Sequence, residues 1–336
     1  MPQPLTGPDI ACGADLKSES TLERVLADGH FAVTAEMVPP KGMDTELVKR
    51  KVGQLKGCVD AANVTDNQTG IVRLSSIATG IICMQEGLEP VIQMTCRDRN
   101  RLAIQSDLLG AGVHGIRNVL CLSGDHQSFG NHPGAKNVHD LDSMQLIRMV
   151  KEMRDENKFQ CGDEIMCGGP RLFIGAAANP FSSPVEMRPL RLAKKVVAGA
   201  DFIQTQMIFD MNRFKKYMRR VVEMGLHEKV SILAGFGPLK STPMAQFLHE
   251  KIPGIVISDY FIQRMDDAVK GIPKEEKEAR RDAWRAEGIK ICIEQIQEAK
   301  KIEGVAGVHI MAIHWEAAIR PIVEGAGLLP RPYGAT

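Results

Sequence analysis

Eight short apolar runs recur along the chain, and stretches with helical patterns lie between them. The runs cover residues 31–37, 59–65, 90–96, 116–124, 171–179, 201–207, 230–236 and 307–313. Most are continuous in hydrophobicity, as expected of parallel strands that helices cover. The helical patterns fall at residues 74–87, 99–113, 141–158, 185–200, 212–226 and 273–304. Eight strand–helix units predict an α/β fold of the (β/α)8 or TIM barrel type.

A doubly wound α/β sheet is the rival architecture. It is disfavoured because no predicted strand leads into a GxGxxG motif that opens a helix, and the GFG at 235–237 is too short. No linker divides the chain, so we expect an N-terminal arm at 1–18, one barrel domain at 19–330 and a C-terminal tail at 331–336. Ser20 and Glu23 have capping-box spacing and Gly29 can end a helix, which predicts a short helix before the first strand.

Composition argues against several classes of protein. A net charge of +1 gives no basic field that would attract nucleic acid. The 44% hydrophobic and 25% charged residues are typical of a globular protein. No apolar run reaches the roughly 18 residues of a membrane span, and the N-terminal sequence lacks the pattern of a secretory signal. We therefore expect a cytoplasmic protein. Its eight cysteines form no CxxC pair and its histidines show no ligand spacing, so no metal site is expected.

Polar residues gather where the predicted strands end. Because the carboxyl ends of barrel strands meet at one face, these side chains should line a single polar bowl. The bowl residues are Glu36, Thr65, Asp66, Asn67, Gln93, Thr95, Arg97, Asp98, Gly124, Asp125, His126, Asn179, Gln204, Gln206, His314 and Glu316. Amides donate and accept at once, which suits an organic ligand with ring N–H and C=O groups. No GxSxG motif indicates a nucleophilic serine.

Glu36 is the least expected residue of the first strand. In FAVTAEMVPP the alternation turns Val33, Ala35 and Met37 toward the helices and Glu36 toward the barrel interior. A carboxylate in that position costs several kcal/mol unless it is paired, hydrogen-bonded or protonated. The sequence therefore predicts a functional carboxyl group at this strand end.

Seven segments together resemble one family of enzymes. They are TAEMVPPK, NVTDNQ, QMTCRDRNR, GIRNVLCLSGD, AAANP, AGADFIQTQMIFD and ILAGFGPLKS, spread in order over about residues 29–328. The set resembles the methylenetetrahydrofolate reductases. The resemblance implies a flavoprotein of one-carbon metabolism and methionine biosynthesis that reduces 5,10-methylenetetrahydrofolate to 5-methyltetrahydrofolate. Reduced flavin N5 would pass a hydride to the one-carbon unit, with NAD(P)H or a partner subunit as electron donor, and a homo-oligomer is expected.

The resemblance also implies roles for individual residues. Glu36 matches the family's general acid, and Asp125 matches the aspartate that binds the pterin and tunes the flavin. Gln206 matches a pterin-binding glutamine, and we expect Gln204 and Leu248 on the substrate side too. The expected flavin-contacting residues are Thr65, Gln93, Gly124, Asp125, Ala177, Asn179 and Lys195.

Several positions depart from the family pattern. Gln93 stands where a histidine is common, Ser123 and Trp315 where arginine is common, and Asn179 and Leu248 at or near aromatic positions. Three alternatives follow. The chain is a flavin reductase linked to NAD(P)H or to a partner electron-transfer subunit, a pterin-dependent methyltransferase barrel without flavin, or a non-catalytic or structural member of an electron-transfer complex. FAD is the expected flavin, with FMN as the alternative.

Overall fold

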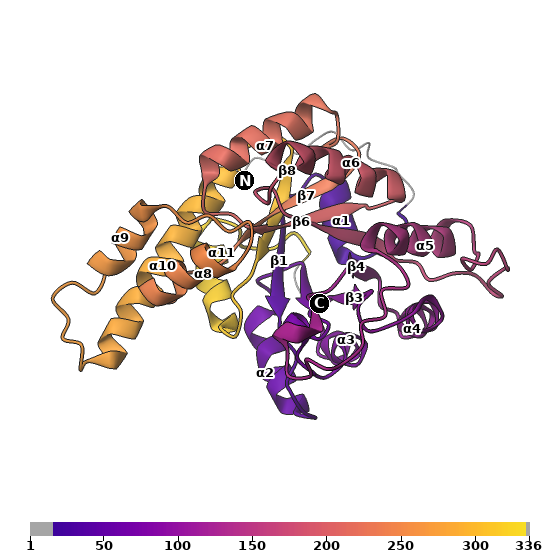
Figure 1. Cartoon of the computed structure of the whole chain (residues 1–336), viewed down its shortest axis with the longest axis horizontal. Coiled ribbons are helices and arrows are strands. Elements are labelled where there is room, and N and C mark those ends of the chain that lie inside the picture. Colours follow the sequence, from indigo (N-terminus) through magenta and orange to yellow (C-terminus); the bar gives the residue numbers. More distant parts are fainter. Residues whose placement is uncertain (1–15, 334–336) are drawn as a thin grey trace.

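Eight parallel strands close into a barrel in the computed structural model, which describes residues 16–333 (Figure 1). The strands pair in chain order, and β8 pairs with β1 to complete the ring. Their bounds are β1 Ala32–Met37, β2 Ala61–Val64, β3 Pro90–Thr95, β4 Asn118–Leu122, β5 Phe173–Ala178, β6 Phe202–Met207, β7 Ser231–Phe236 and β8 Val305–Ile310. All eight predicted strands are present, and the (β/α)8 prediction is confirmed.

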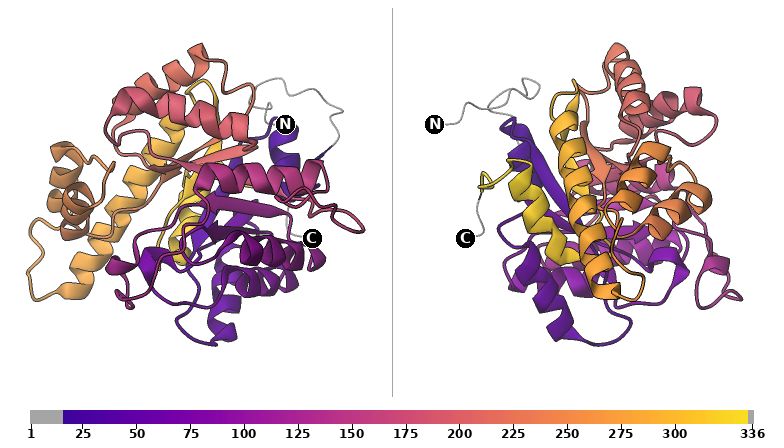
Figure 2. Two further views of the ribbon diagram at one scale, coloured as in Figure 1. Left: turned by 45° about the vertical axis from the view of Figure 1, so that its right-hand side comes forward. Right: turned by 90° about the vertical axis from the view of Figure 1, so that its left-hand side faces the viewer.

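Helices surround the barrel and connect the strands (Figure 2). Their bounds are α1 Thr21–Ala27, α2 Thr45–Leu55, α3 Ser76–Gln85, α4 Arg101–Val113, α5 Ser143–Asp155, α6 Arg188–Ala198, α7 Met211–Glu223, α8 Thr242–Lys251, α9 Asp259–Asp267, α10 Lys277–Ala299 and α11 Ile319–Gly325. Short 3-10 turns lie in the loops: η1 Gln68–Gly70, η2 Gln127–Phe129, η3 Val185–Met187 and η4 Glu316–Ala318. Among the described residues, no helix is both long and apolar enough to cross a bilayer.

Two apolar layers form because side chains alternate along each strand. On β1, Val33, Ala35 and Met37 belong to the outer cluster, where α2 contributes Val48 and Val52. Ala32 faces the interior and joins a second cluster that fills the barrel. The orientation expected for the first strand is therefore confirmed.

Helix α1 closes the floor of the barrel, which is the face formed by the amino ends of the strands. Its Leu22, Val25 and Leu26 belong to the interior cluster. Ser20 caps the helix by accepting from the Glu23 N–H at 3.0 Å, as predicted. The Glu23 carboxylate does not complete a capping box, because it accepts instead from the Ser18 N–H and hydroxyl.

Helices α8, α9 and α10 project from one side of the barrel, at the left in Figure 1. They enclose a satellite apolar cluster that includes Leu248, Met265 and Ile291. The sequence predicted a helix starting near Pro273, but α10 begins at Lys277. Pro273 instead lies in the turn before it, where its carbonyl accepts from the Glu276 N–H.

The described end of the chain returns to the floor of the barrel. Arg331 is buried and forms a bidentate ion pair with Asp60, at 3.0 Å and 2.6 Å. Asp60 also accepts from the Val33 N–H at 2.7 Å. Residues just beyond α11 are therefore fixed against β1 and β2. The parts of the predicted arm and tail at residues 1–15 and 334–336 lie outside the described residues.

Candidate active site

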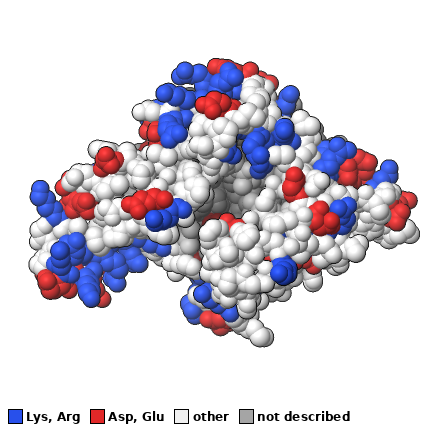
Figure 3. All heavy atoms as spheres, in the orientation of Figure 1, with Lys and Arg blue, Asp and Glu red and all other residues white. Residues whose placement is uncertain are grey.

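The carboxyl ends of the strands form the mouth of the barrel, where most of the predicted site residues meet. Glu36, Thr65 and Gln206 occupy inward-facing positions in the last two residues of β1 and β6 or just after β2, and Gln93 lies deeper, two residues before the end of β3. Asp125 follows β4 across the mouth. Figure 3 shows a face of the molecule hollowed near its centre, with acidic and basic side chains at the margin.

Glu36 is buried at the end of β1, with 8% of its surface exposed. Burial raises the pKa of its carboxyl from the ordinary 4.5 to about 7. A hydrogen bond from Gln68 Nε2 at 3.3 Å opposes this shift, while the charges of Asp125 and Glu316 add to it. The group therefore holds its proton up to neutral pH and can donate it.

Asp125 is presented by a turn that its neighbours fix. Its carboxylate accepts from the Thr69 N–H at 3.0 Å, and its backbone carbonyl accepts from the Arg97 guanidinium at 2.9 Å. Gly124 has φ +88, and a Cβ there would lie 3.0 Å from the Arg97 Cβ. Glycine is needed for this close approach, so Gly124 shapes the turn that exposes Asp125.

The two glutamines of β6 have different surroundings. Gln204 lies deep in the barrel and pairs reciprocally with the Asn63 amide, and its Nε2 also donates to the Thr34 hydroxyl at 3.1 Å. A register shift between Gln204 and Met207 interrupts the pairing of β6 with β7. Gln206 emerges from this irregularity half-buried, with its Oε1 accepting from the Met207 N–H. Only Gln206 is therefore positioned at the mouth.

Three of the predicted flavin contacts lie near the carboxyl ends of β2 and β5. Thr65 is fully buried, and its hydroxyl has no hydrogen-bond partner among the described residues. Lys195 on α6 donates to the Ala177 carbonyl at 2.5 Å. Burial, with repulsion from Arg191, lowers the pKa of Lys195 to about 8. A free hydroxyl and a desolvated ammonium group fit a large polar cofactor that carries ring carbonyls and phosphates.

Three other predicted residues have mainly structural surroundings. Gln93 is buried, and its backbone carbonyl accepts from Ser76. Asn179 reaches from the end of β5 to the Pro253 carbonyl at 3.0 Å, so it ties β5 to the loop after α8. Leu248 belongs to the satellite cluster of α8 to α10. The structure thus brings Glu36, Thr65, Gly124, Asp125, Ala177, Lys195 and Gln206 to the mouth, and gives Gln93, Gln204, Asn179 and Leu248 other partners or mainly structural surroundings.

Sequence reasoning missed several residues near Glu36. Gln68, Lys51 and Arg73 contact Glu36 or the carbonyls just beyond it, yet they lie on a 3-10 turn, a helix and a loop. Only Gln68, in the quoted NVTDNQ segment, stood close to a predicted strand end. Asn63 falls on the inward register of β2 and could have been found from the alternation alone.

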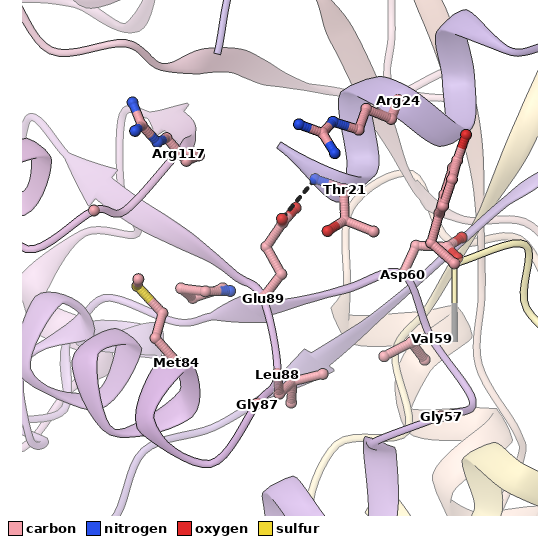
Figure 4. Close-up of a pocket in the computed structure, with 13 residues that line it drawn as sticks. Thr21, Arg24, Gly57, Val59, Asp60, Met84, Gly87, Leu88, Glu89 and Arg117 are labelled. Atoms are coloured by element: carbon pink, nitrogen blue, oxygen red, sulfur yellow. Dashed lines mark hydrogen bonds between the residues drawn. The ribbon is translucent and has the colours of Figure 1, made fainter. Parts of the chain in front are cut away.

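A cavity of about 420 Å³ lies on the floor, away from Glu36 (Figure 4). Its lining includes Arg24, Glu89 and Arg117. In Figure 4 the Glu89 carboxylate points to the first turn of α1, where it accepts from the Thr21 N–H at 2.6 Å. Its second oxygen accepts from Asn118 at 2.9 Å. Glu89 therefore holds α1 in place, and the mouth remains the candidate active site.

The groups at the mouth suit an organic ligand better than a metal ion. Within residues 16–333, no three His, Cys, Asp or Glu side chains lie close enough to hold a metal ion. What the mouth presents instead is a protonated acid, an exposed carboxylate, an amide and a partly desolvated lysine. That set can bind a heterocycle and deliver a proton to it.

Comparisons with known proteins agree with this geometry. The family model for methylenetetrahydrofolate reductase matches residues 21–327. A probable methylenetetrahydrofolate reductase (NADPH) of Caenorhabditis elegans is 25% identical over 80% of this chain and 36% of its own length. Methylenetetrahydrofolate reductase 2 of Saccharomyces cerevisiae is 28% identical over 77% of this chain and 40% of its own length.

One further relative and one solved structure align over a larger share of their own length. The 5,10-methylenetetrahydrofolate reductase of Salmonella typhimurium is 25% identical over 67% of this chain and 71% of its own length. A Clostridium thermocellum protein solved with two copies of 5-methyl-5,6,7,8-tetrahydrofolic acid has the same fold, with a TM-score of 0.59 at 12% identity over 92% of this chain and 100% of that one. The chain spans well under half the length of the worm and yeast relatives. Because the family model covers almost the whole described barrel, the chain belongs to the methylenetetrahydrofolate reductase family.

Proposed function

We propose that the chain reduces 5,10-methylenetetrahydrofolate to 5-methyltetrahydrofolate with Glu36 as general acid. The observation that carries the proposal is the buried Glu36 carboxyl, whose pKa is raised to about 7 at the mouth of a barrel of this family. An acid that keeps its proton near neutral pH is what protonation of a weakly basic ring nitrogen requires.

Glu36 has one chemical task in this proposal. Its proton goes to a ring nitrogen of the imidazolidine, the ring C–N bond breaks, and the one-carbon unit becomes an electrophilic iminium. Asp125 and Gln206 would hold the pterin by hydrogen bonds, since their groups at the mouth include a carboxylate and an amide N–H₂. Burial raises the pKa of Glu36, so much of the carboxyl still carries its proton near neutral pH when substrate binds.

The flavin would be held by Thr65, Ala177 and Lys195, and when bound it supplies the hydride for the one-carbon unit. The unpartnered Thr65 hydroxyl and the lowered pKa of Lys195 support this assignment. The Caenorhabditis elegans relative is named for NADPH, and a probable methylenetetrahydrofolate reductase (NADH) of Oryza sativa, 24% identical, is named for NADH, which supports a pyridine nucleotide as electron donor. The folate-bound Clostridium thermocellum structure supports a folate ligand on this fold.

The cofactor test comes first because it separates the alternatives. The purified protein should be yellow, and anaerobic 5-methyltetrahydrofolate should bleach its flavin bands. The flavin released on denaturation identifies FAD or FMN. A colourless protein that binds no added flavin contradicts the proposal and favours a methyltransferase barrel.

The donor test follows with NADH and NADPH added separately under anaerobic conditions. Bleaching by either one identifies the donor. A yellow protein that 5-methyltetrahydrofolate reduces, but neither nucleotide does, indicates an electron-transfer partner subunit. Homo-oligomerisation and cytoplasmic location also stay predictions, and sedimentation and cell fractionation test them.

A further inference from the structure

The loop that follows Glu36 is held by three separate donors. The Val38 carbonyl accepts from Lys51 Nζ at 2.9 Å, and the Pro39 carbonyl accepts from the Arg73 guanidinium at 3.0 Å. The Pro40 carbonyl accepts from the Leu74 N–H at 2.9 Å. Because the two prolines also restrict the backbone, the segment that sets the height of Glu36 has little freedom.

Lys51 does more than hold a carbonyl. Its ammonium group pairs with Glu316 Oε1 at 2.6 Å, and their side chains are only 10% and 6% exposed. Lys51 lies on α2 and Glu316 on η4 after β8, 265 positions apart in sequence. A buried ion pair gains little stability over an apolar pair of the same shape, so its presence beside the mouth calls for another explanation.

We propose that Lys51 and Glu316 act as a positioning pair for Glu36, with the lysine fixing the loop and the two charges balancing each other beside the acid. The inference rests on the proposed function, because it concerns the proton that Glu36 delivers. Neither residue touches the ring nitrogen, so both act through Glu36.

Several charged groups face the part of the mouth that holds Glu36 and the Lys51–Glu316 pair. Asp125 and Glu316 both raise the pKa of Glu36. Lys51 lies against the Glu316 carboxylate and offsets its charge. The other charged groups of this corner are His314, whose pKa is lowered by burial and then by Lys51 and Arg73, and Lys240, whose ammonium donates to the Ile313 carbonyl.

Removing one partner should therefore shift Glu36 in a direction that depends on which partner is removed. In Glu316→Gln an uncompensated Lys51 favours the charged form of Glu36 and lowers its pKa. In Lys51→Met an uncompensated Glu316 raises it. The double variant restores neutrality and should return the pKa toward that of the wild type. A purely structural role predicts loss of activity without opposite shifts.

The experiment measures the folate half-reaction against pH in the flavin-loaded protein. The alkaline limb of this pH–rate profile should shift about one pH unit lower in Glu316→Gln, which corresponds to a rate about tenfold lower at pH 8.5. In Lys51→Met it should shift higher by a similar amount. Lys51→Arg keeps the charge and should keep the wild-type limb. Flavin reduction by the electron donor or by dithionite should not change.

Lys56→Met is the matched control, because Lys56 follows the same helix and donates to the Glu86 carbonyl at 3.1 Å on the floor side. It should leave the limb in place. Limbs that coincide in all variants, or that move the same way in both single variants, overturn the inference. A wild-type protein without any folate half-reaction instead contradicts the proposed function. Urea unfolding of each variant verifies that the barrel is intact.

Discussion

The floor and the mouth of the barrel differ in how fully their buried polar groups are paired, although the mouth also holds the buried Lys51–Glu316 pair. On the floor, each buried acid has strong partners: Asp60 pairs with Arg331, and Asp201 pairs with Arg154 at 2.5 Å. Glu89 accepts two N–H groups of α1. These bonds satisfy the carboxylate oxygens, and those of Glu89 fix the helix that closes the barrel.

At the mouth, comparable groups are left partly unsatisfied. Glu36 has a single side-chain hydrogen bond of 3.3 Å, and the Thr65 hydroxyl has no partner among the described residues. Lys195 has a neutral carbonyl as its partner, and its pKa is lowered to about 8. Buried polar groups without partners cost stability in the free protein, so the difference supports the proposal that the mouth residues bind ligands while the floor residues hold the fold.

Glu36→Gln tests the mouth most strongly. The amide has nearly the same shape but no acidic proton, so folate turnover should fall roughly 10²–10⁴-fold while flavin content and flavin reduction persist. Stopped-flow absorbance of the two half-reactions measures this. If the flavin half-reaction fell and the folate half-reaction survived, the acid would have to be another residue.

Arg331→Met tests the floor. It leaves Asp60 buried without its cation, and breaking such a pair costs about 3–5 kcal/mol of unfolding free energy. Urea titration measures the loss. Turnover per folded molecule should stay close to the wild type, and a large fall in kcat would contradict the separation of roles.

The pH dependence of stability tests Glu36 without any substrate. Its pKa is 4.5 ordinarily and about 7 in the native protein, so between these values the native state keeps a proton that the unfolded chain has lost. Stability is therefore lost as pH rises from about 4.5 to 7. Glu36→Gln removes this dependence, and its stability relative to the wild type should grow by about 3 kcal/mol between pH 4 and pH 8. Equal pH profiles would refute a raised pKa.

Lys195→Met tests the flavin side of the mouth. Loss of one charged hydrogen-bond donor should weaken flavin retention about tenfold. Equilibrium dialysis followed by flavin absorbance measures it. Lys194→Met, on the exposed neighbouring position of α6, is the matched control and should retain flavin like the wild type.

Lys215→Met gives the smallest effect and calibrates the others. Its pair with Glu298 spans 2.6 Å between side chains that are 46% and 41% exposed. Exposed pairs contribute less than about 1 kcal/mol, so unfolding should barely change. A loss comparable to that of Arg331→Met would mean that burial does not distinguish the two pairs.

The barrel itself was readable from local patterns. The inward and outward positions of β1 follow from alternation, and continuous apolar runs identify strands covered by helices. The ends of those strands then placed Glu36 and Gln206 at one face. Local pattern suffices here because strand geometry fixes where each side chain points.

What the sequence did not reveal depends on distant partners. Lys51 looks like an ordinary surface charge, and nothing local links it to Glu316, which was expected in the bowl, until the fold brings the two within 2.6 Å. Gln204 and Gln206 share one strand face, and only the register shift after Gln204 separates their surroundings. The start of α10 also escaped, because proline at a first turn and proline in a preceding loop have the same local sequence.

The seal made by α1 has a consequence for how the chain is made. Leu22 and Val25 are translated more than two hundred residues before Leu233 of β7, which belongs to the same interior cluster. During synthesis the apolar face of α1 therefore cannot be fully buried until β7 has been translated. Its docking is a late event that reports completion of the barrel, and until then this segment is a natural target for chaperones that bind exposed apolar helices.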